Sequence, residues 1–127
     1  MSRTFISAVP GVPTSPSPIS NAVVVGNTCH ISGQLAVYED GYRAGSAGKE
    51  ADRAFDLVSM IAEAAGFCTE EIVYVDIAFA DIERDLAEVN EVCRQRFSQF
   101  PARTIYAAAN LPFGAKIKVQ AIAMKDV

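Results

Sequence analysis

Residues 46–65 carry a single apolar stripe, and this stripe limits which folds the chain can adopt. Its members recur at the i, i+3 and i+4 spacing of an α-helix: Ala51, Ala54, Phe55, Val58, Ile61, Ala62 and Ala65. Polar and charged side chains occupy the other side, and Gly66 supplies a stop signal. A helix with one apolar face must cover an apolar surface, which the rest of the chain has to provide.

The segments expected to form that surface have the residue patterns of β-strands. Residues 72–79 alternate, with Val73, Val75, Ile77 and Phe79 predicted on one face and Tyr74, Asp76 and Ala78 on the other. Gly26-Asn27 is a tight-turn signal that predicts a hairpin of residues 22–25 and 28–33. The other predicted strands are residues 5–9, 103–109 and 115–124, and residues 35–44 hold a second turn signal, Glu39-Asp40-Gly41.

A second helix is expected near residues 85–97. Asp85-Leu86-Ala87-Glu88 resembles a capping box, with Asp in place of Ser or Thr, and the stripe that follows is Leu86, Val89, Cys93 and Phe97. Residues 10–18 contain four prolines and are expected to form an extended loop. The resulting order of elements predicts an α+β fold with a mixed sheet and two helices on one face.

The length of 127 residues fits a single domain spanning residues 1–127. Two helices can cover only one face of the sheet, so other copies of the chain are expected to cover the second face.

Composition argues against several classes of function. A net charge of −4 disfavours nucleic acid as a partner, because phosphate binding relies on a basic surface. No run of about 18 apolar residues predicts a membrane span, and the N-terminus lacks a signal-peptide core. Cys29, Cys68 and Cys93 form no CxxC pair and, with one histidine, give no zinc set. We expect three buried, reduced thiols and a cytoplasmic protein.

Arg103 is the strongest candidate for binding a ligand. It lies at the start of the predicted strand 103–109, and a planar guanidinium can give a carboxylate two charge-assisted hydrogen bonds. A structural surface arginine is the alternative. Lys118, on the strand that returns, is the second candidate cation.

Short fragments along nearly the whole chain resemble one family. They are Val25-Gly26-Asn27, Ile31-Ser32-Gly33-Gln34, Glu63-Ala64-Ala65-Gly66, Val89-Asn90-Glu91-Val92, Phe100-Pro101-Ala102-Arg103 and Leu111-Pro112, followed by Ala121-Ile122-Ala123. In this order and spacing they resemble the RidA/YjgF family of small enamine/imine deaminases. The resemblance implies a chorismate-mutase-like fold and a homotrimer with a central barrel and ligand clefts between subunits. It also implies hydrolysis of 2-aminoacrylate-type enamines, or their imine tautomers, to 2-keto acids and ammonia without a metal or organic cofactor.

The resemblance assigns roles to particular positions. Arg103 would grip the substrate carboxylate, and backbone at Ser32, Gly33 and Ile105 would complete the grip. The chain departs from the family pattern at four positions: Lys118 and Gln120 replace two glutamates, the first of which positions water, Ile19 replaces a tyrosine, and Ile105 replaces a frequent cysteine.

These departures leave several roles open. Lys118 could bind a second carboxylate, act as a neutral amine base or Schiff-base former, or be an exposed strand lysine. His30 could replace the missing base, or be a packed or solvent-facing histidine. Ser32 could bind substrate or end a strand, and Asn90 could line the cleft or tie a loop.

Two functions follow from this site. The first is hydrolytic deamination of carboxylate-bearing enamines or imines, either 2-aminoacrylate-like or a dicarboxylate such as 2-aminomuconate. The alternative is a non-catalytic trimer that binds small carboxylates as a sensor or partner-binding protein. RNA cleavage is disfavoured by the acidic charge and by the absence of basic or aromatic patches.

Overall fold

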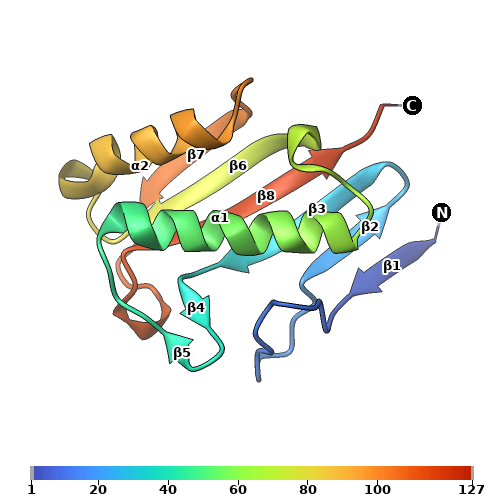
Figure 1. Ribbon diagram of the computed structural model, residues 1–127, viewed down its shortest axis with the longest axis horizontal. Helices are drawn as coiled ribbons and strands as arrows, with labels where there is room; N and C mark the ends of the chain where they lie inside the picture. Colours follow the sequence, from blue (N-terminus) through green and yellow to red (C-terminus); the bar gives the residue numbers. More distant parts are fainter. Residues whose placement is uncertain (1, 127) are drawn as a thin grey trace.

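Two helices lie side by side on one face of a six-stranded mixed sheet in the computed structural model, which describes residues 2–126 (Figure 1). The strands are β1 (Arg3–Ile6), β2 (Ala22–Val25), β3 (Thr28–Gln34), β6 (Ile72–Phe79), β7 (Ala102–Ala107) and β8 (Ile117–Met124), with a separate hairpin of β4 (Val37–Tyr38) and β5 (Gly41–Tyr42). The helices are α1 (Ala47–Ala64) and α2 (Ile82–Arg96), with single 3₁₀ turns η1 (Thr69–Glu71) and η2 (Pro112–Gly114). The sheet order is β1-β2-β3-β8-β6-β7, and only β6 and β7 are parallel. This architecture confirms the predicted α+β class.

Helix α1 forms where its apolar stripe predicts. The Ser46 side chain caps it by accepting a hydrogen bond from the Lys49 N–H, and Gly66 follows its last turn with a positive φ of 91°. Six of the seven predicted stripe residues are almost fully buried, and Ala65 packs at their margin. The stripe therefore lies flat on the sheet, across β3 and β8 (Figure 1).

Helix α2 begins earlier than the predicted capping box. Asp81 is the N-cap and accepts a hydrogen bond from the Arg84 N–H, whereas Asp85 lies inside the helix, is buried and pairs with Arg84 at 2.9 Å. The predicted start at Asp85 was therefore wrong. Asp81 and Asp85 are one helical turn apart, so the local pattern does not tell which of them caps the helix.

Two strand predictions need correction. The first strand ends at Ile6 rather than Val9, because Ala8 has a positive φ of 55° and Val9 turns into the core. In β6, the register steps from Ile72–Ala123 to Tyr74–Ile122, so Val73 is an extra residue in a β-bulge. Its side chain is 42% exposed and does not share the buried face of Val75, as had been predicted.

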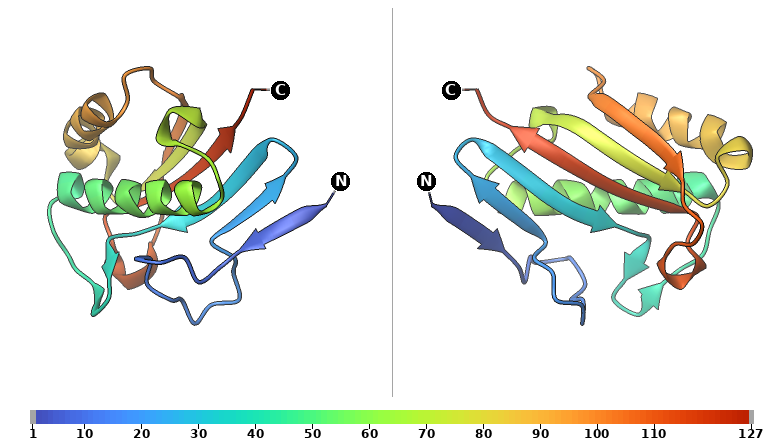
Figure 2. Two further views of the ribbon diagram at one scale, coloured as in Figure 1. Left: turned by 45° about the vertical axis from the view of Figure 1, so that its right-hand side comes forward. Right: turned by 180° about the vertical axis from the view of Figure 1, so that it is seen from behind.

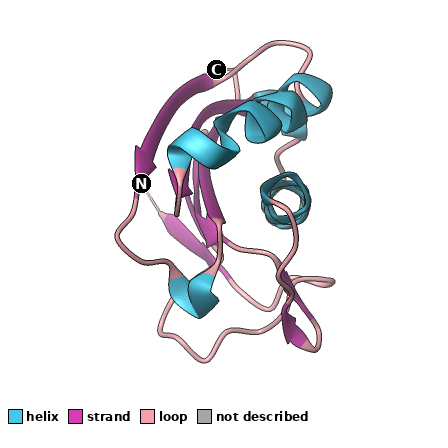
Figure 3. Cartoon of the chain, turned by 90° about the vertical axis from the view of Figure 1, so that its left-hand side faces the viewer, coloured by secondary structure: helices cyan, strands magenta, loops and turns pink. Residues whose placement is uncertain are grey.

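The face of the sheet opposite the helices is bare in the single chain (Figure 2, right; Figure 3). Along β8, alternate residues from Ile117 to Ala123 are buried under the helices, while Lys118, Gln120, Ile122 and Met124 point to the bare face. One carboxylate oxygen of Asp76, on this face, is buried without a hydrogen-bond partner among residues 2–126. Ala78 lies on the same face as Asp76, as predicted, and packs against Leu111 and Ala115.

Two expectations from composition can be compared with the structure. Neither α1 nor α2 has the length and apolar composition that crossing a bilayer requires. The three cysteines are free thiols, but only Cys29 is buried; Cys93 is half-buried and Cys68 is exposed. The prediction that all three are buried was therefore wrong, because Cys68 lies in the turn before η1 rather than on a covered face.

Candidate functional site

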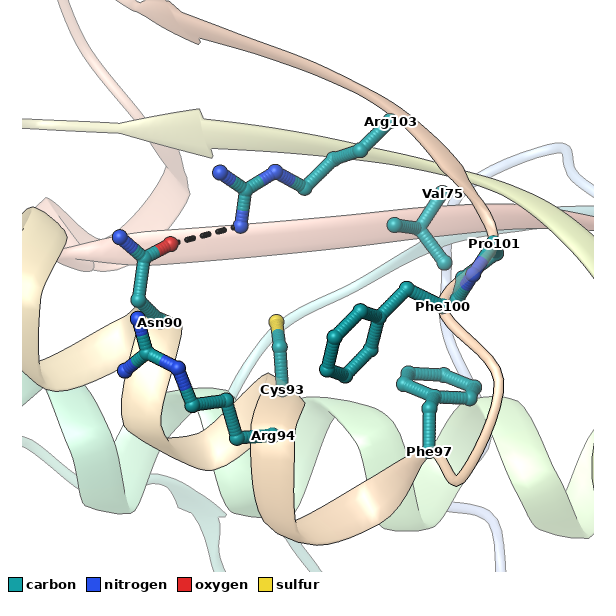
Figure 4. A pocket seen from close by; sticks show the side chains of 8 residues that line it. All are labelled: Val75, Asn90, Cys93, Arg94, Phe97, Phe100, Pro101 and Arg103. Atoms are coloured by element: carbon teal, nitrogen blue, oxygen red, sulfur yellow. Dashed lines mark hydrogen bonds between the residues drawn. The ribbon is translucent and has the colours of Figure 1, made fainter.

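A pocket of about 280 Å³ lies between β7 and α2, and Arg103 is part of its wall (Figure 4). The other lining residues are Val75, Asn90, Cys93, Arg94, Phe97, Phe100 and Pro101. Arg103 is opposite Val75 in the parallel β6–β7 register, so its side chain leaves the sheet on the helix-covered face. The pocket thus forms where the edge strand β7 faces the second helix.

The guanidinium of Arg103 is held in place from α2. Its Nη1 donates a hydrogen bond of 2.8 Å to the Oδ1 of Asn90. Among residues 2–126, Arg103 forms no ion pair; its remaining side-chain neighbour is the Cys93 thiol, so most of its five N–H donors stay available. This is a guanidinium that has been oriented but not neutralised, and it can bind a carboxylate through two parallel hydrogen bonds.

Cys93 lies in the middle of this pocket, with Arg103 and Asn90 on one side and the phenylalanines on the other (Figure 4). Burial raises the pKa of its thiol, and the nearby positive charge of Arg103 only partly opposes that effect. A thiol rather than a thiolate is therefore expected at neutral pH, and a neutral thiol is a weak nucleophile. The position of Cys93 favours a role in the pocket wall over one in covalent chemistry.

Acid–base groups are missing from the described wall of this pocket, which contains no Asp, Glu or His. Arg94, the other cation, is exposed and pairs with Glu91 at 3.2 Å. Within one chain, the pocket can bind and orient an anion, but it holds no carboxylate or imidazole that could activate water.

Lys118 does not reach Arg103 within one chain. It lies opposite Ala78 in the β6–β8 register and points to the bare face, while Arg103 points to the helix-covered face. Its aliphatic stem covers Gly33 so closely that a Cβ at residue 33 would lie 3.0 Å from the Lys118 Cδ. The two predicted cations therefore stand on opposite faces of the same sheet.

Ser32 and His30 both lie on β3, away from the Arg103 pocket. Ser32 is on the β3 side of the sheet, where its Oγ donates to the Ser20 carbonyl at 2.6 Å and ties down the loop before β2. His30 is exposed, between Val23 and Ile122 in the sheet, and lies outside the Arg103 pocket.

Ile105 and Ile19 also lie far from each other in the chain's fold. Ile105 follows Arg103 on the same face of β7 and packs at the margin of the core. Ile19 is 55% exposed on the proline-rich loop, in a small hollow with Pro13 and Asn21. Within one chain, the structure brings together only Arg103 and Asn90 of the predicted binding residues.

The apolar part of the pocket was not predicted from the sequence. Phe97 was expected in the stripe of the second helix, and no role was predicted for Phe100. The signal that could have found them is their position: both lie in the short link between α2 and β7, which must bring the end of the helix back to the strand that carries Arg103.

A buried carboxylate outside the pocket was also missed. Glu50 is 1% exposed and accepts hydrogen bonds from the Tyr42 hydroxyl at 2.7 Å and the Lys116 N–H at 2.9 Å. Burial, together with the hydrogen bond to Glu50 and its negative charge, raises the pKa of Tyr42 to about 12. Glu50 therefore joins β5, α1 and the start of β8 and has a structural role.

Comparison with known proteins places this architecture in a family. The family model described as Endoribonuclease L-PSP matches residues 12–125. A 2-iminobutanoate/2-iminopropanoate deaminase of Bos taurus is 37% identical over 116 residues, which cover 89% of this chain and 84% of the relative.

Two solved structures share the fold over nearly the whole chain. The YjgF gene product of E. coli has a TM-score of 0.90 at 30% identity, covering 97% of this chain and 99% of that one. E. coli TdcF with bound serine has a TM-score of 0.90 at 26% identity, covering 97% and 100%. The predicted resemblance is thereby confirmed, and the chain belongs to the RidA/YjgF family, which the Endoribonuclease L-PSP model represents.

Proposed function

We propose that this chain is a hydrolytic deaminase that converts carboxylate-bearing enamines or imines into keto acids and ammonia. The observation that carries the proposal is Arg103, a guanidinium oriented by Asn90 and left without an acidic partner among the described residues. The name of the Bos taurus relative, an iminobutanoate and iminopropanoate deaminase, supports the same reaction class. The serine bound in TdcF supports a small ligand that carries a carboxylate.

The proposed reaction consumes one water for each ammonia released. An enamine substrate first gains a proton at carbon and loses one from nitrogen to become the imine, whereas an imine substrate enters directly. Water then adds to the C=N bond, and the resulting carbinolamine loses ammonia to give the C=O of the keto acid. Arg103 binds the carboxylate throughout, and its contribution is to hold the C=N carbon in one position where water can attack.

We further propose that the active form is a homotrimer with its ligand clefts between subunits. Arg103 and Lys118 stand on opposite faces of one sheet, so a cleft that used both would have to take them from different chains. The bare sheet face, on which Lys118 lies, is the surface that such an assembly would cover (Figure 2). In such a cleft, Lys118 would orient water or bind a second carboxylate, with backbone at Ser32, Gly33 and Ile105 lining the site and His30 and Ile19 near it.

Ammonia release tests the proposal directly. 2-Aminoacrylate and 2-aminomuconate would be generated enzymatically, and ammonia measured with wild-type protein and with the Arg103→Ala and Lys118→Glu variants. Acceleration by the wild type that is lost in Arg103→Ala is the expected result. No acceleration of either substrate at high protein concentration would refute the enzymatic function.

Mixed assemblies test the shared cleft. If Arg103→Ala and a Lys118 variant are each inactive, co-refolded mixtures should regain activity, because some clefts then contain both native residues. Mixtures that stay inactive, although native mass spectrometry shows mixed trimers, would contradict the shared cleft.

A non-catalytic protein that binds small carboxylates is the second candidate. It is favoured by the described wall of the Arg103 pocket, which contains no Asp, Glu or His, and by Lys118 at the position of the family glutamate. Stabilisation by carboxylates without any turnover would identify this function, since a ligand that binds only the native state raises the melting temperature.

Neither candidate uses a cofactor, a membrane or a nucleic acid in our proposal. The net charge of −4 opposes phosphate binding, although the matching family model is described as an endoribonuclease. Salt-sensitive binding of RNA at micromolar protein concentration would contradict the proposal that no nucleic acid is bound. The free thiols support a location in the reducing cytoplasm.

A further inference from the structure

We infer that the Arg103 pocket is selective for imino and enamino acids with a large apolar side chain, which lies against Phe97 and Phe100. The inference rests on the proposed deaminase function and narrows its substrate class. It assigns the carboxylate to one end of the pocket and the side chain of the substrate to the other.

Polar and apolar groups are separated along the pocket (Figure 4). The guanidinium of Arg103 and the amide of Asn90 lie at one end, with Arg94 beside them. Val75, Phe97, Phe100 and Pro101 lie at the other end, and the half-buried Cys93 lies between the two groups. A molecule with a carboxylate head and an apolar tail matches this division.

The apolar wall combines a fixed side and an open side. Phe97 is 7% exposed and packs edge-on against Phe55, with ring centroids 5.7 Å apart and an interplanar angle of 76°. Phe100 is 68% exposed, although it borders the same pocket. A tail placed in the pocket against Phe100 would therefore remove a phenylalanine surface from water at a site that is already formed.

The size of the pocket permits such a tail. An apolar cavity of about 150 Å³ is large enough to hold a benzene ring. The pocket beside Arg103 measures about 280 Å³, so it has room for a carboxylate and a ring or branched alkyl chain together.

The charged residues around the pocket limit which substrate side chains can bind. No Asp or Glu lines its described wall, so a cationic side chain would find no partner there. A second carboxylate at the apolar end would lose its hydration without compensation, which disfavours dicarboxylates in this pocket. Arg94 does not offset that cost, because it lies at the polar end and pairs with Glu91.

Binding of stable carboxylates tests the selectivity without requiring turnover. Dissociation constants would be measured by calorimetry for propanoate, pentanoate and 3-phenylpropanoate. Each methylene buried against the apolar wall should tighten binding by about fourfold. We expect 3-phenylpropanoate to bind at least about tenfold more tightly than propanoate, and equal affinities would overturn the inference.

Two exposed phenylalanines provide a matched pair of variants. Phe100→Ala should remove most of the preference for 3-phenylpropanoate while propanoate binding stays within about twofold. Phe113→Ala serves as the control, because Phe113 is 66% exposed and lies outside this pocket, against Tyr42. Loss of the preference in both variants, or in neither, would overturn the assignment to Phe100.

Turnover separates this inference from the proposed function. Imines of alanine and phenylalanine would be generated by an amino-acid oxidase, and their decay followed with the wild type and Phe100→Ala. Graded carboxylate binding without imine hydrolysis would uphold the apolar subsite and overturn the deaminase. Hydrolysis of both imines at equal kcat/KM, with no graded binding, would uphold the deaminase and overturn the subsite.

Discussion

Arg103 and Asn90 join strand β7 to helix α2 through a hydrogen bond of 2.8 Å between Nη1 and Oδ1. An amide oxygen orients the guanidinium without cancelling its charge. A carboxylate at the same position would orient the guanidinium equally well, but it would form an ion pair with it and neutralise the positive charge that a ligand carboxylate needs.

Replacing Asn90 with Asp should therefore weaken ligand binding while leaving the fold intact. The new carboxylate would compete for the guanidinium, so the affinity for 3-phenylpropanoate should fall by about tenfold or more, with an unchanged or slightly higher melting temperature. Asn110→Asp adds the same charge at an exposed position outside the pocket wall and should leave affinity unchanged. Equal affinity in the wild type and Asn90→Asp would contradict the orienting role.

Lysine should not substitute for Arg103. A single ammonium cannot give the paired hydrogen bonds of a guanidinium, and losing one charge-assisted hydrogen bond corresponds to about tenfold to a hundredfold. Arg103→Lys should lower kcat/KM for imine hydrolysis by that range. Arg43→Lys is the control, because Arg43 forms an exposed ion pair with Asp40 outside the pocket. Full activity of Arg103→Lys would show that charge alone is sufficient.

Glu50 and Tyr42 predict a loss of stability at alkaline pH. The folded-state pKa of Tyr42 is raised to about 12, above the ordinary value near 10. Its stabilisation is therefore fully present below about pH 10 and is lost as the pH rises through about 12. Tyr42→Phe should be less stable at neutral pH by about 1.5–3 kcal/mol, because buried Glu50 loses a hydrogen-bond donor.

Urea unfolding of both proteins between pH 8 and pH 12 measures this effect. The stability difference between the wild type and Tyr42→Phe should shrink as the pH rises. A difference that stays constant over the whole range would mean that Tyr42 does not titrate with a raised pKa. Tyr106→Phe, at an exposed tyrosine without a hydrogen bond among the described residues, is the control.

Gly33→Ala should displace the stem of Lys118. The added Cβ would lie 3.0 Å from Cδ and 3.2 Å from Cγ, so the lysine side chain must move. We expect a loss of about 1 kcal/mol in the free energy of unfolding. The same change in a Lys118→Ala background should cost much less, and a double-mutant cycle measures the difference. An equal cost in both backgrounds would place the strain elsewhere.

Local patterns predicted the parts of the fold that depend on one segment alone. The α1 stripe and the hairpin at Gly26-Asn27 were placed correctly, because helical periodicity and turn formation depend on residues close in the sequence. The start of α2 was placed wrongly, since Asp81 and Asp85 are equally suitable N-cap residues one turn apart. The bulge at Val73 depends on how β6 aligns with β8, about 50 residues later, and no local pattern encodes that register.

The candidate site was likewise predictable only where a local pattern was enough. Arg103 was found because a lone cation at the start of an apolar strand is visible in the sequence. Its separation from Lys118 was not predicted, because the faces on which the two side chains project depend on how β7 and β8 are each aligned with β6. The apolar wall was missed because Phe97 and Phe100 become neighbours of Arg103 only when the chain folds back between α2 and β7.

The crossover from β6 through α2 to β7 has a consequence for altering selectivity. Except for Val75, every residue of the pocket wall lies between residues 90 and 103, in one contiguous stretch of chain. Its link, residues 97–101, runs outside the sheet at the edge strand. Lengthening or shortening that link would resize the cavity while the strand registers of the sheet stay as they are. The segment therefore behaves as an exchangeable cassette, and transplanting it between relatives should transfer preference for substrate size independently of the scaffold.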